Sequence, residues 1–166
     1  MRRRTRVIAL LGLGMLAAAL ATQHAAPLVI YNPSPSVPTG FYVRAPGPPA
    51  AVGDFVTLRA VNAAPAYAAT RGFADRTDRF IKRVAAGPGQ TVCAAGEAVT
   101  LDDVEIARRA SSDSAGRPLP TWSGCRVLGA GEVFLLGDTP DSFDGRYWGP
   151  TPLVAIDGVW RPLGGP

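Results

Sequence analysis

The sequence is poor in the side chains that most enzymes use for catalysis. Its 166 residues include one histidine, two cysteines and a single lysine. The one histidine, His24, lies in an apolar N-terminal run, so a Ser-His-Asp triad or a Cys-His pair is excluded from the rest of the chain. The same scarcity argues against a zinc site, and we expect no metal and no other cofactor. Lys82 is the only lysine among 17 basic residues.

The basic residues also lack the distribution of a nucleic-acid binder. The formal net charge is +4, and four of the positive charges belong to Arg2, Arg3, Arg4 and Arg6. Without them, 17 − 4 = 13 basic residues face 13 acidic ones. The rest of the chain is therefore neutral, and no nucleic-acid partner is predicted.

The N-terminal arginines precede an uncharged stretch that runs from Val7 to Thr22, and the apolar character continues to Ile30. This pattern is typical of a single membrane anchor with its arginines in the cytoplasm, or of a cleavable secretory signal. The stretch is long enough to cross about 30 Å of hydrocarbon, so we favour an anchor over residues 1–26. The "ALA" at 19–21 would suit cleavage instead. In both cases residues 27–166 lie outside the cytoplasmic membrane, facing the periplasm.

Residues 27–166 are predicted to form one mainly β domain. The chain is 47% hydrophobic, which argues against disorder, and its 19 glycines and 16 prolines favour many turns over a helical bundle. Proline also excludes helix from the segment that follows the anchor. Strands are expected over 53–60, 79–86, 98–107 (as a hairpin), 132–138 and 153–162, with weak helical character over 61–79 and a loop over 111–124. The expected fold is an antiparallel barrel or sandwich.

Two cysteines, Cys93 and Cys125, remain for a structural role. In an oxidising compartment they could form a disulfide, which would stabilise the fold by roughly 3–4 kcal/mol in the chain-entropy model. Two separately buried thiols are the alternative.

Lys82 lies in the expected strand 79–86, where residues two apart share a face. Phe80, Lys82 and Val84 then point the same way, and apolar neighbours lower the pKa of a lysine. A neutral amine can act as a general base, whereas the guanidinium of arginine stays protonated. The pattern therefore predicts a catalytic lysine. The alternative is a surface lysine in an arginine-rich composition.

A lysine base requires a nucleophile. A Ser-x-x-Lys pair is excluded because position 79 is arginine. A serine distant in sequence remains, and "NPSPSVPTG" presents Ser34 and Ser36 between prolines on a stiff backbone. The alternative is a proline-rich stalk that lifts the domain off the membrane.

Four segments in order resemble the boxes of the bacterial type I signal peptidase family, and most closely its conjugative-transfer branch, the TraF-type pilin-processing peptidases. They are "SPSVPTGFY" as the serine box, "VGDFVTL" as the strand that follows it, "FIKRVAAGPGQTV" as the lysine box and "LLGDTPDSFDGRYWG" as the Gly-Asp box. Together they span most of residues 31–160.

The resemblance implies a role for each matching residue. Ser36 would be the nucleophile and Lys82 the general base, and the backbone N–H of Ser36 with the Ser34 hydroxyl would form the oxyanion hole. Ser142 would orient the lysine. Asp144 and Arg146 match an ion pair that braces the active-site strand, and Asp138 opens their loop.

Three departures separate the chain from housekeeping signal peptidases. The loop from Gly137 to Arg146 is one residue shorter, Val37 replaces the methionine that follows the nucleophile, and no large second domain is inserted. Each favours a dedicated processing enzyme.

The function expected from the resemblance is that of a membrane-anchored serine endopeptidase. It would remove the leader from a secreted or pilin precursor, bound as an extended strand, and would cut after small residues; relatives also join pilin ends into a ring. Two alternatives are a non-catalytic pilus-assembly scaffold with the same fold and a self-cleaving Ser-Lys repressor-type protease. The exported N-terminus argues against the second.

Overall fold

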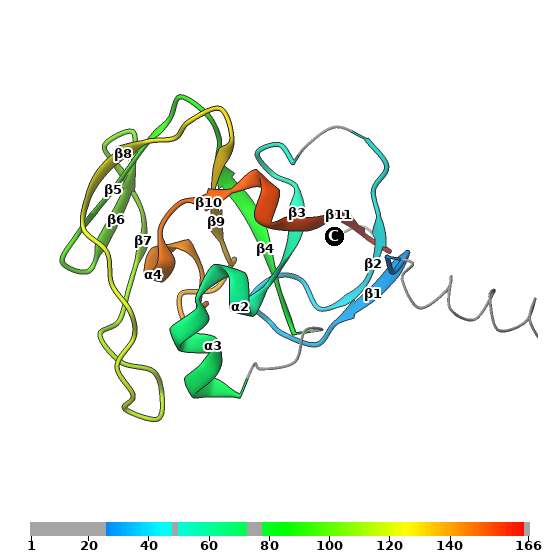
Figure 1. Cartoon of the computed structure of the whole chain (residues 1–166), viewed down its shortest axis with the longest axis horizontal. Coiled ribbons are helices and arrows are strands. Elements are labelled where there is room, and N and C mark those ends of the chain that lie inside the picture. Colours follow the sequence, from blue (N-terminus) through cyan, green and yellow to red (C-terminus); the bar gives the residue numbers. More distant parts are fainter. Residues whose placement is uncertain (1–25, 48–49, 73–77, 165–166) are drawn as a thin grey trace, which may run out of the picture.

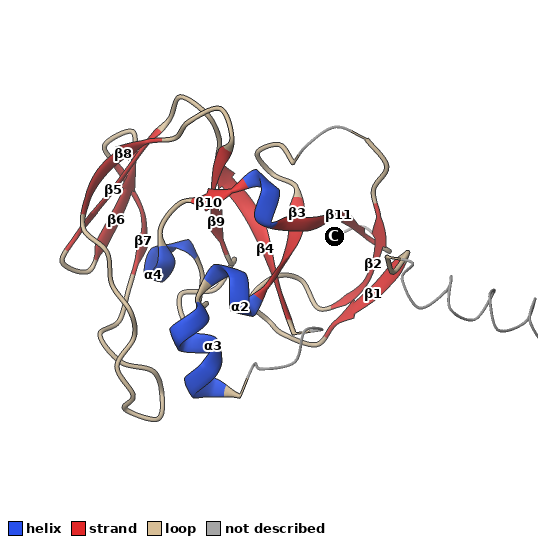
Figure 2. Ribbon diagram, in the orientation of Figure 1, coloured by secondary structure: helices blue, strands red, loops and turns tan. Residues whose placement is uncertain are grey.

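The computed structural model of the protein describes residues 26–47, 50–72 and 78–164. These residues form two antiparallel sheets, with short helices between and beside them (Figures 1 and 2). The larger sheet has the strand order β1-β2-β11-β3-β4-β9-β10. Its strands are β1 (Val29–Asn32), β2 (Gly40–Arg44), β3 (Phe55–Arg59), β4 (Arg79–Ala86), β9 (Glu132–Leu136), β10 (Thr151–Pro152) and β11 (Ile156–Pro162).

Strand β4 lies inside this sheet, and its alternating side chains serve two hydrophobic clusters. Ile81 packs with Val37, Tyr42, Phe55 and Trp160, while Val84 packs with residues of β3 and β9 on the other face. The pattern is that of a central strand, since successive side chains point to opposite faces. Pairing between β4 and β9 starts only at Arg83, one residue beyond Lys82.

The smaller sheet has the order β7-β6-β5-β8. A cluster that includes Ala86, Val92, Leu128 and Phe134 joins it to the larger sheet. Cys93 and Cys125 lie directly opposite each other on β5 and β8, and they form a disulfide. The alternative of two free thiols is therefore wrong. The strands are β5 (Thr91–Ala95), β6 (Ala98–Leu101), β7 (Val104–Arg108) and β8 (Gly124–Val127).

The weak helical signal after β3 corresponds to two short helices, α2 (Ala60–Ala63) and α3 (Pro65–Arg71). Proline occupies the first turn of α3, where its missing N–H costs no helical hydrogen bond, and Gly72 ends the helix in the left-handed conformation. A third helix, α4 (Gly145–Trp148), lies at the end of the Gly-Asp box.

The mainly β, antiparallel architecture agrees with the prediction, but the sheets do not close into a barrel. Within the described ranges, β1 and β10 stand at opposite ends of the larger sheet and do not pair with each other. Strand β10 has only two residues, too few to extend the sheet around a barrel.

The expected anchor over residues 1–26 falls almost wholly outside the described part of the chain, which begins at residue 26. Across residues 26–47, 50–72 and 78–164, none of the helices has the length and apolar character to cross a membrane.

Candidate active site

The structure brings Ser36 and Lys82 together, although 46 positions separate them in the sequence. Ser36 lies in the loop 33–39 that joins β1 to β2, and Lys82 projects from β4. The Lys82 Nζ atom lies 2.9 Å from Ser36 Oγ. Both side chains are buried, with 4% of Lys82 and 8% of Ser36 exposed. This is hydrogen-bonding distance for a nucleophile and a base.

Burial makes the Lys82 ammonium easier to deprotonate. The pKa of Lys82 is lowered from 10.5 to about 8, chiefly by desolvation; the nearby Asp144 carboxylate opposes this shift and the Arg146 guanidinium adds to it. With a pKa near 8, about one molecule in ten has a neutral lysine at pH 7. At 10.5 the fraction would be about one in three thousand. The site therefore supplies an amine that can accept a proton.

Ser34 lies beside the nucleophile rather than beside the lysine. Its hydroxyl donates to Ser36 Oγ at 3.2 Å, and the Ser36 N–H donates to Ser34 Oγ at 3.3 Å. The Ser34 hydroxyl and the Ser36 backbone N–H thus lie next to each other beside the Ser36 side chain. Two such donors are the components of an oxyanion hole.

Ser142 provides a second hydroxyl that contacts the lysine. Lys82 Nζ donates to Ser142 Oγ at 3.1 Å, so the amine is held between two serine hydroxyls. The Ser142 hydroxyl and the Ser36 carbonyl both pack against Gly137, which has no side chain to occupy this space. A Cβ atom on Gly137 would lie 2.7 Å from the Ser36 carbonyl oxygen and closer still to the Ser142 hydroxyl.

Asp144 and Arg146 form a buried ion pair behind this loop. Arg146 Nε lies 2.8 Å from Asp144 Oδ1, and Asp144 is fully buried. The other Asp144 oxygen accepts from the Gly137 N–H at 2.7 Å. Arg146 also donates to the carbonyls of Pro140 and Thr139. The pair therefore fixes the loop that carries Ser142.

The side chain of Asp138 bonds to Arg83, the residue after the lysine. It pairs with the Arg83 guanidinium at 2.7 Å, and both groups are about a third exposed. Its backbone is more directly involved, because the Asp138 N–H donates to the Ser36 carbonyl at 2.6 Å. Asp138 thus ties the Gly-Asp loop to the nucleophile loop.

A hollow of about 330 Å³ opens in front of the two serines and the lysine. Helix α3 supplies one wall, where Tyr67 stacks on Phe143 with ring centroids 3.5 Å apart. The remaining lining residues come from β4 and the two loops: Ser34, Pro35, Ser36, Arg79, Phe80, Lys82, Thr139, Asp141 and Ser142. The volume falls within the usual range for ligand sites.

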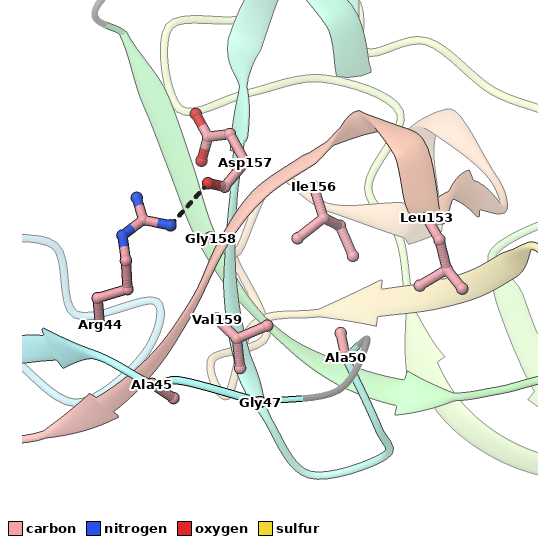
Figure 3. Close-up of a pocket in the computed structure, with 9 residues that line it drawn as sticks. All are labelled: Arg44, Ala45, Gly47, Ala50, Leu153, Ile156, Asp157, Gly158 and Val159. Carbon is pink, nitrogen blue, oxygen red and sulfur yellow. Dashed lines mark hydrogen bonds between the residues drawn. The ribbon is translucent and has the colours of Figure 1, made fainter. Parts of the chain in front are cut away.

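A second hollow, of about 280 Å³, lies between the segment after β2 and the start of β11 (Figure 3). Arg44 donates to the Asp157 carbonyl at 3.0 Å at its edge. Its lining residues are Arg44, Ala45, Gly47, Ala50, Leu153, Ile156, Asp157, Gly158 and Val159. None of them is a serine, cysteine, lysine or histidine, so this hollow lacks a nucleophile–base pair.

Sequence reasoning overlooked three residues of the site. Asn32 is buried and bonds to the nucleophile loop, Arg83 pairs with Asp138, and Gly137 lies against Ser36 and Ser142. An asparagine just before a proline–serine repeat is a common turn signal, so Asn32 could have been found. The tight approach at Gly137 required coordinates.

A mainly β protein in which a buried serine and lysine meet at the floor of a cleft has the construction of a serine peptidase. Residues 3–162 match the family model of signal peptidases, peptidase S26. The chain therefore belongs to the S26 signal peptidase family. The resemblance seen in the sequence is confirmed.

The relatives include transfer proteins of several bacteria. The "Conjugal transfer protein TraF" of Agrobacterium tumefaciens is 31% identical over 98% of this chain and 97% of its own length. The "Probable conjugal transfer protein TraF" of Sinorhizobium fredii is 34% identical over 95% of this chain and 90% of its own length.

A "Plasmid transfer protein TraF" of Escherichia coli is 38% identical over 51% of this chain, and the match spans 49% of that relative. The chain thus spans about half the length of this curated relative. Among solved structures, a signal peptidase I from Enterococcus faecalis matches with a TM-score of 0.38 and 20% identity, over 69% of this chain and 97% of that one.

Proposed function

We propose that the protein is a serine endopeptidase in which Ser36 is the nucleophile and Lys82 the general base. The observation that carries this proposal is the 2.9 Å approach of Lys82 Nζ to Ser36 Oγ in a buried site. The pKa of about 8 supports it, because the amine is neutral in a useful fraction of molecules near neutral pH.

In this mechanism the neutral Lys82 amine takes the Ser36 proton as Oγ attacks the carbonyl carbon of the scissile peptide bond. The carbonyl oxygen becomes an oxyanion, which the Ser36 N–H and the Ser34 hydroxyl stabilise. Lys82 then gives its proton to the leaving amine, and an acyl-enzyme remains on Ser36. In the second half Lys82 takes a proton from water as the water oxygen attacks the acyl carbon. The bond between that carbon and Ser36 Oγ then breaks, Lys82 returns the proton to Ser36 Oγ, and the product leaves with a new carboxyl group. An amine in place of water would join two chain ends instead.

Ser142, Asp144 and Arg146 are proposed to support this chemistry by position. Ser142 limits the rotation of the Lys82 ammonium, and the Asp144–Arg146 pair fixes the loop that holds Ser142. The side chain of Asp138 braces Arg83 on the neighbouring face, while its N–H anchors Ser36. Accurate placement of these groups matters because a displacement of about 1 Å can cost about 10²-fold in rate.

The proposed substrate is a precursor of a secreted protein or a pilin, since the relatives are named as plasmid and conjugal transfer proteins. We expect the precursor to bind as an extended strand. Pairing of β9 with β4 begins only after Lys82, which leaves room for such a segment beside the pocket. We further propose that residues 1–26 anchor the protein in the cytoplasmic membrane, with the catalytic domain facing the periplasm.

The proposal is tested by incubating the full-length protein with precursors encoded by the same conjugative system and identifying the products by mass spectrometry. The unmodified protein should release one defined fragment, and Ser36→Ala and Lys82→Arg should release none while remaining folded. Ser114→Ala, at an exposed position, is the matched control and should retain activity. An active Lys82→Arg variant would refute the assignment of the base. A folded protein that cleaves none of the precursors would favour the scaffold alternative.

The location is tested separately by fractionating cells and adding an external protease after the outer membrane is opened. The proposal predicts that the chain pellets with the membrane and that its domain is accessible only from the periplasmic side. Protection from the protease would contradict the orientation.

A further inference from the structure

The loop that carries Ser36 has an unusual backbone composition. Prolines occupy positions 33, 35 and 38, and proline has no N–H to donate. Strands β1 and β2 pair only up to Asn32 and Gly40, so the strand ladder does not hold the intervening loop. Buried carbonyl groups need a hydrogen-bond donor, and the donors to this loop come from residues outside 33–39.

The side chain of Asn32 supplies most of the hydrogen bonds that the loop carbonyl groups need. Its Nδ2 donates to the carbonyls of Ser34 at 2.8 Å, Pro38 at 3.1 Å and Val37 at 3.2 Å. Its Oδ1 accepts from the Ser34 N–H at 3.1 Å. Asn32 is only 4% exposed. A single amide therefore binds the chain on both sides of Ser36.

Two further contacts complete the arrangement. The Tyr42 hydroxyl donates to the Pro38 carbonyl at 2.6 Å, and the Asp138 N–H donates to the Ser36 carbonyl at 2.6 Å. Among these groups, Asn32 alone contacts both the segment that bears Ser34 and the segment that follows Ser36. The position of the hydroxyl relative to the lysine, and the direction of the Ser36 N–H, depend on this loop conformation.

We propose that Asn32 is a positioning residue that holds the nucleophile loop in its reactive conformation. Its amide sets the Ser36 hydroxyl at reaction distance from Lys82 and keeps the Ser34 hydroxyl beside the Ser36 N–H. The proposal rests on the proposed Ser36–Lys82 chemistry. It assigns to Asn32 no contact with the reacting atoms.

The test uses the full-length protein and p-nitrophenyl acetate, a small ester that reaches Ser36 without filling the cleft. The burst of p-nitrophenolate reports acylation of Ser36. Asn32→Leu keeps a similar volume and removes both donor and acceptor. Asn32→Asp keeps the shape and the bond to the Ser34 N–H, but turns an oxygen toward the three carbonyls.

Both variants should lower the burst rate and kcat by about 10²-fold while KM for a cleaved precursor stays near its original value, because the binding walls are intact. Thr151→Val is the matched control. It removes a buried hydroxyl that accepts from Trp148 Nε1, on the two-residue strand at the far edge of the sheet from β1. It should lower the melting temperature without changing the burst rate.

An Asn32→Leu or Asn32→Asp protein with the original burst rate would overturn the proposal, as would a change in melting temperature alone. If the leucine variant does not fold, the aspartate variant decides the question. If the unmodified protein shows no burst and cleaves no precursor, the proposed peptidase function fails first. An active unmodified protein with unaffected variants would refute only the role of Asn32.

Discussion

The pH dependence of catalysis offers a quantitative test of the role of Lys82. Burial lowers the pKa of Lys82 to about 8, and only the neutral amine can take the Ser36 proton. The logarithm of kcat/KM should therefore rise by about one per pH unit below pH 8 and level off above it. At about pH 6 the rate should be about 100-fold below the plateau.

A charge substitution sharpens this test. Asp141 lines the pocket, and its negative charge raises the pKa of Lys82. Asp141→Asn should therefore move the rising limb of the profile to lower pH. Asp103→Asn, in the turn between β6 and β7, changes the same charge at a position that does not contribute to the pKa of Lys82, and should leave the profile unchanged.

The assay is the initial rate of precursor cleavage across the pH range, with folding checked at each pH by circular dichroism. A flat profile between about pH 6 and pH 9 would refute the assignment of Lys82 as the base, and so would a limb that rises only near the ordinary lysine pKa of about 10.4. A shift of the Asp141→Asn profile to higher pH would contradict the electrostatic argument.

Three further predictions concern stability and geometry. The pKa of Lys82 is lower in the folded protein than in the unfolded one, so burying the charged lysine destabilises the fold below about pH 8, and this cost disappears as the pH rises to 10.5. Lys82→Met should therefore raise the free energy of unfolding at pH 7 by up to about 3 kcal/mol, measured by urea denaturation. An equal gain above pH 10.5 would contradict this. Ser142→Ala should lower kcat about tenfold in the cleavage assay, since it removes one hydrogen bond to the base, and an unchanged kcat would make Ser142 dispensable. Gly137→Ala should lower kcat by about 10²-fold, because the added Cβ would displace Ser142 and the Ser36 carbonyl. Gly131→Ala, where an added Cβ meets open space, should leave kcat unchanged. Equal effects of the two substitutions would refute this steric argument.

The strands with apolar, alternating sequences were predictable. The expected strand 79–86 corresponds to β4, and the hairpin around Asp102 and Asp103 corresponds to β6 and β7. The strands β1, β2, β5 and β8 and the two-residue β10 were missed. Strand β8 is exposed along its whole length, so hydrophobic alternation gave no signal there, and β1 begins inside the apolar run that was assigned to the anchor. The number of strands alone did not distinguish open sheets from a closed barrel, because closure depends on pairing between distant edges.

The candidate site was predictable because few residues of the chain can act as a base or a nucleophile. A single lysine and the absence of histidine from the domain pointed to Lys82, and three prolines drew attention to Ser36. The pairing of Asp138 with Arg83 and the bonds of Asn32 depend on how segments of the chain meet in the fold. Short sequence patterns do not predict contacts between segments that are distant in sequence.

The most direct test of the central claim is to locate the acyl group after brief exposure of the full-length protein to p-nitrophenyl acetate at pH 8. Peptide mapping by mass spectrometry should find the acetyl group on Ser36 in the unmodified protein and should not find it there in the Lys82→Arg variant. An acetyl group on another serine, or one that forms on Ser36 equally fast without Lys82, would contradict the account.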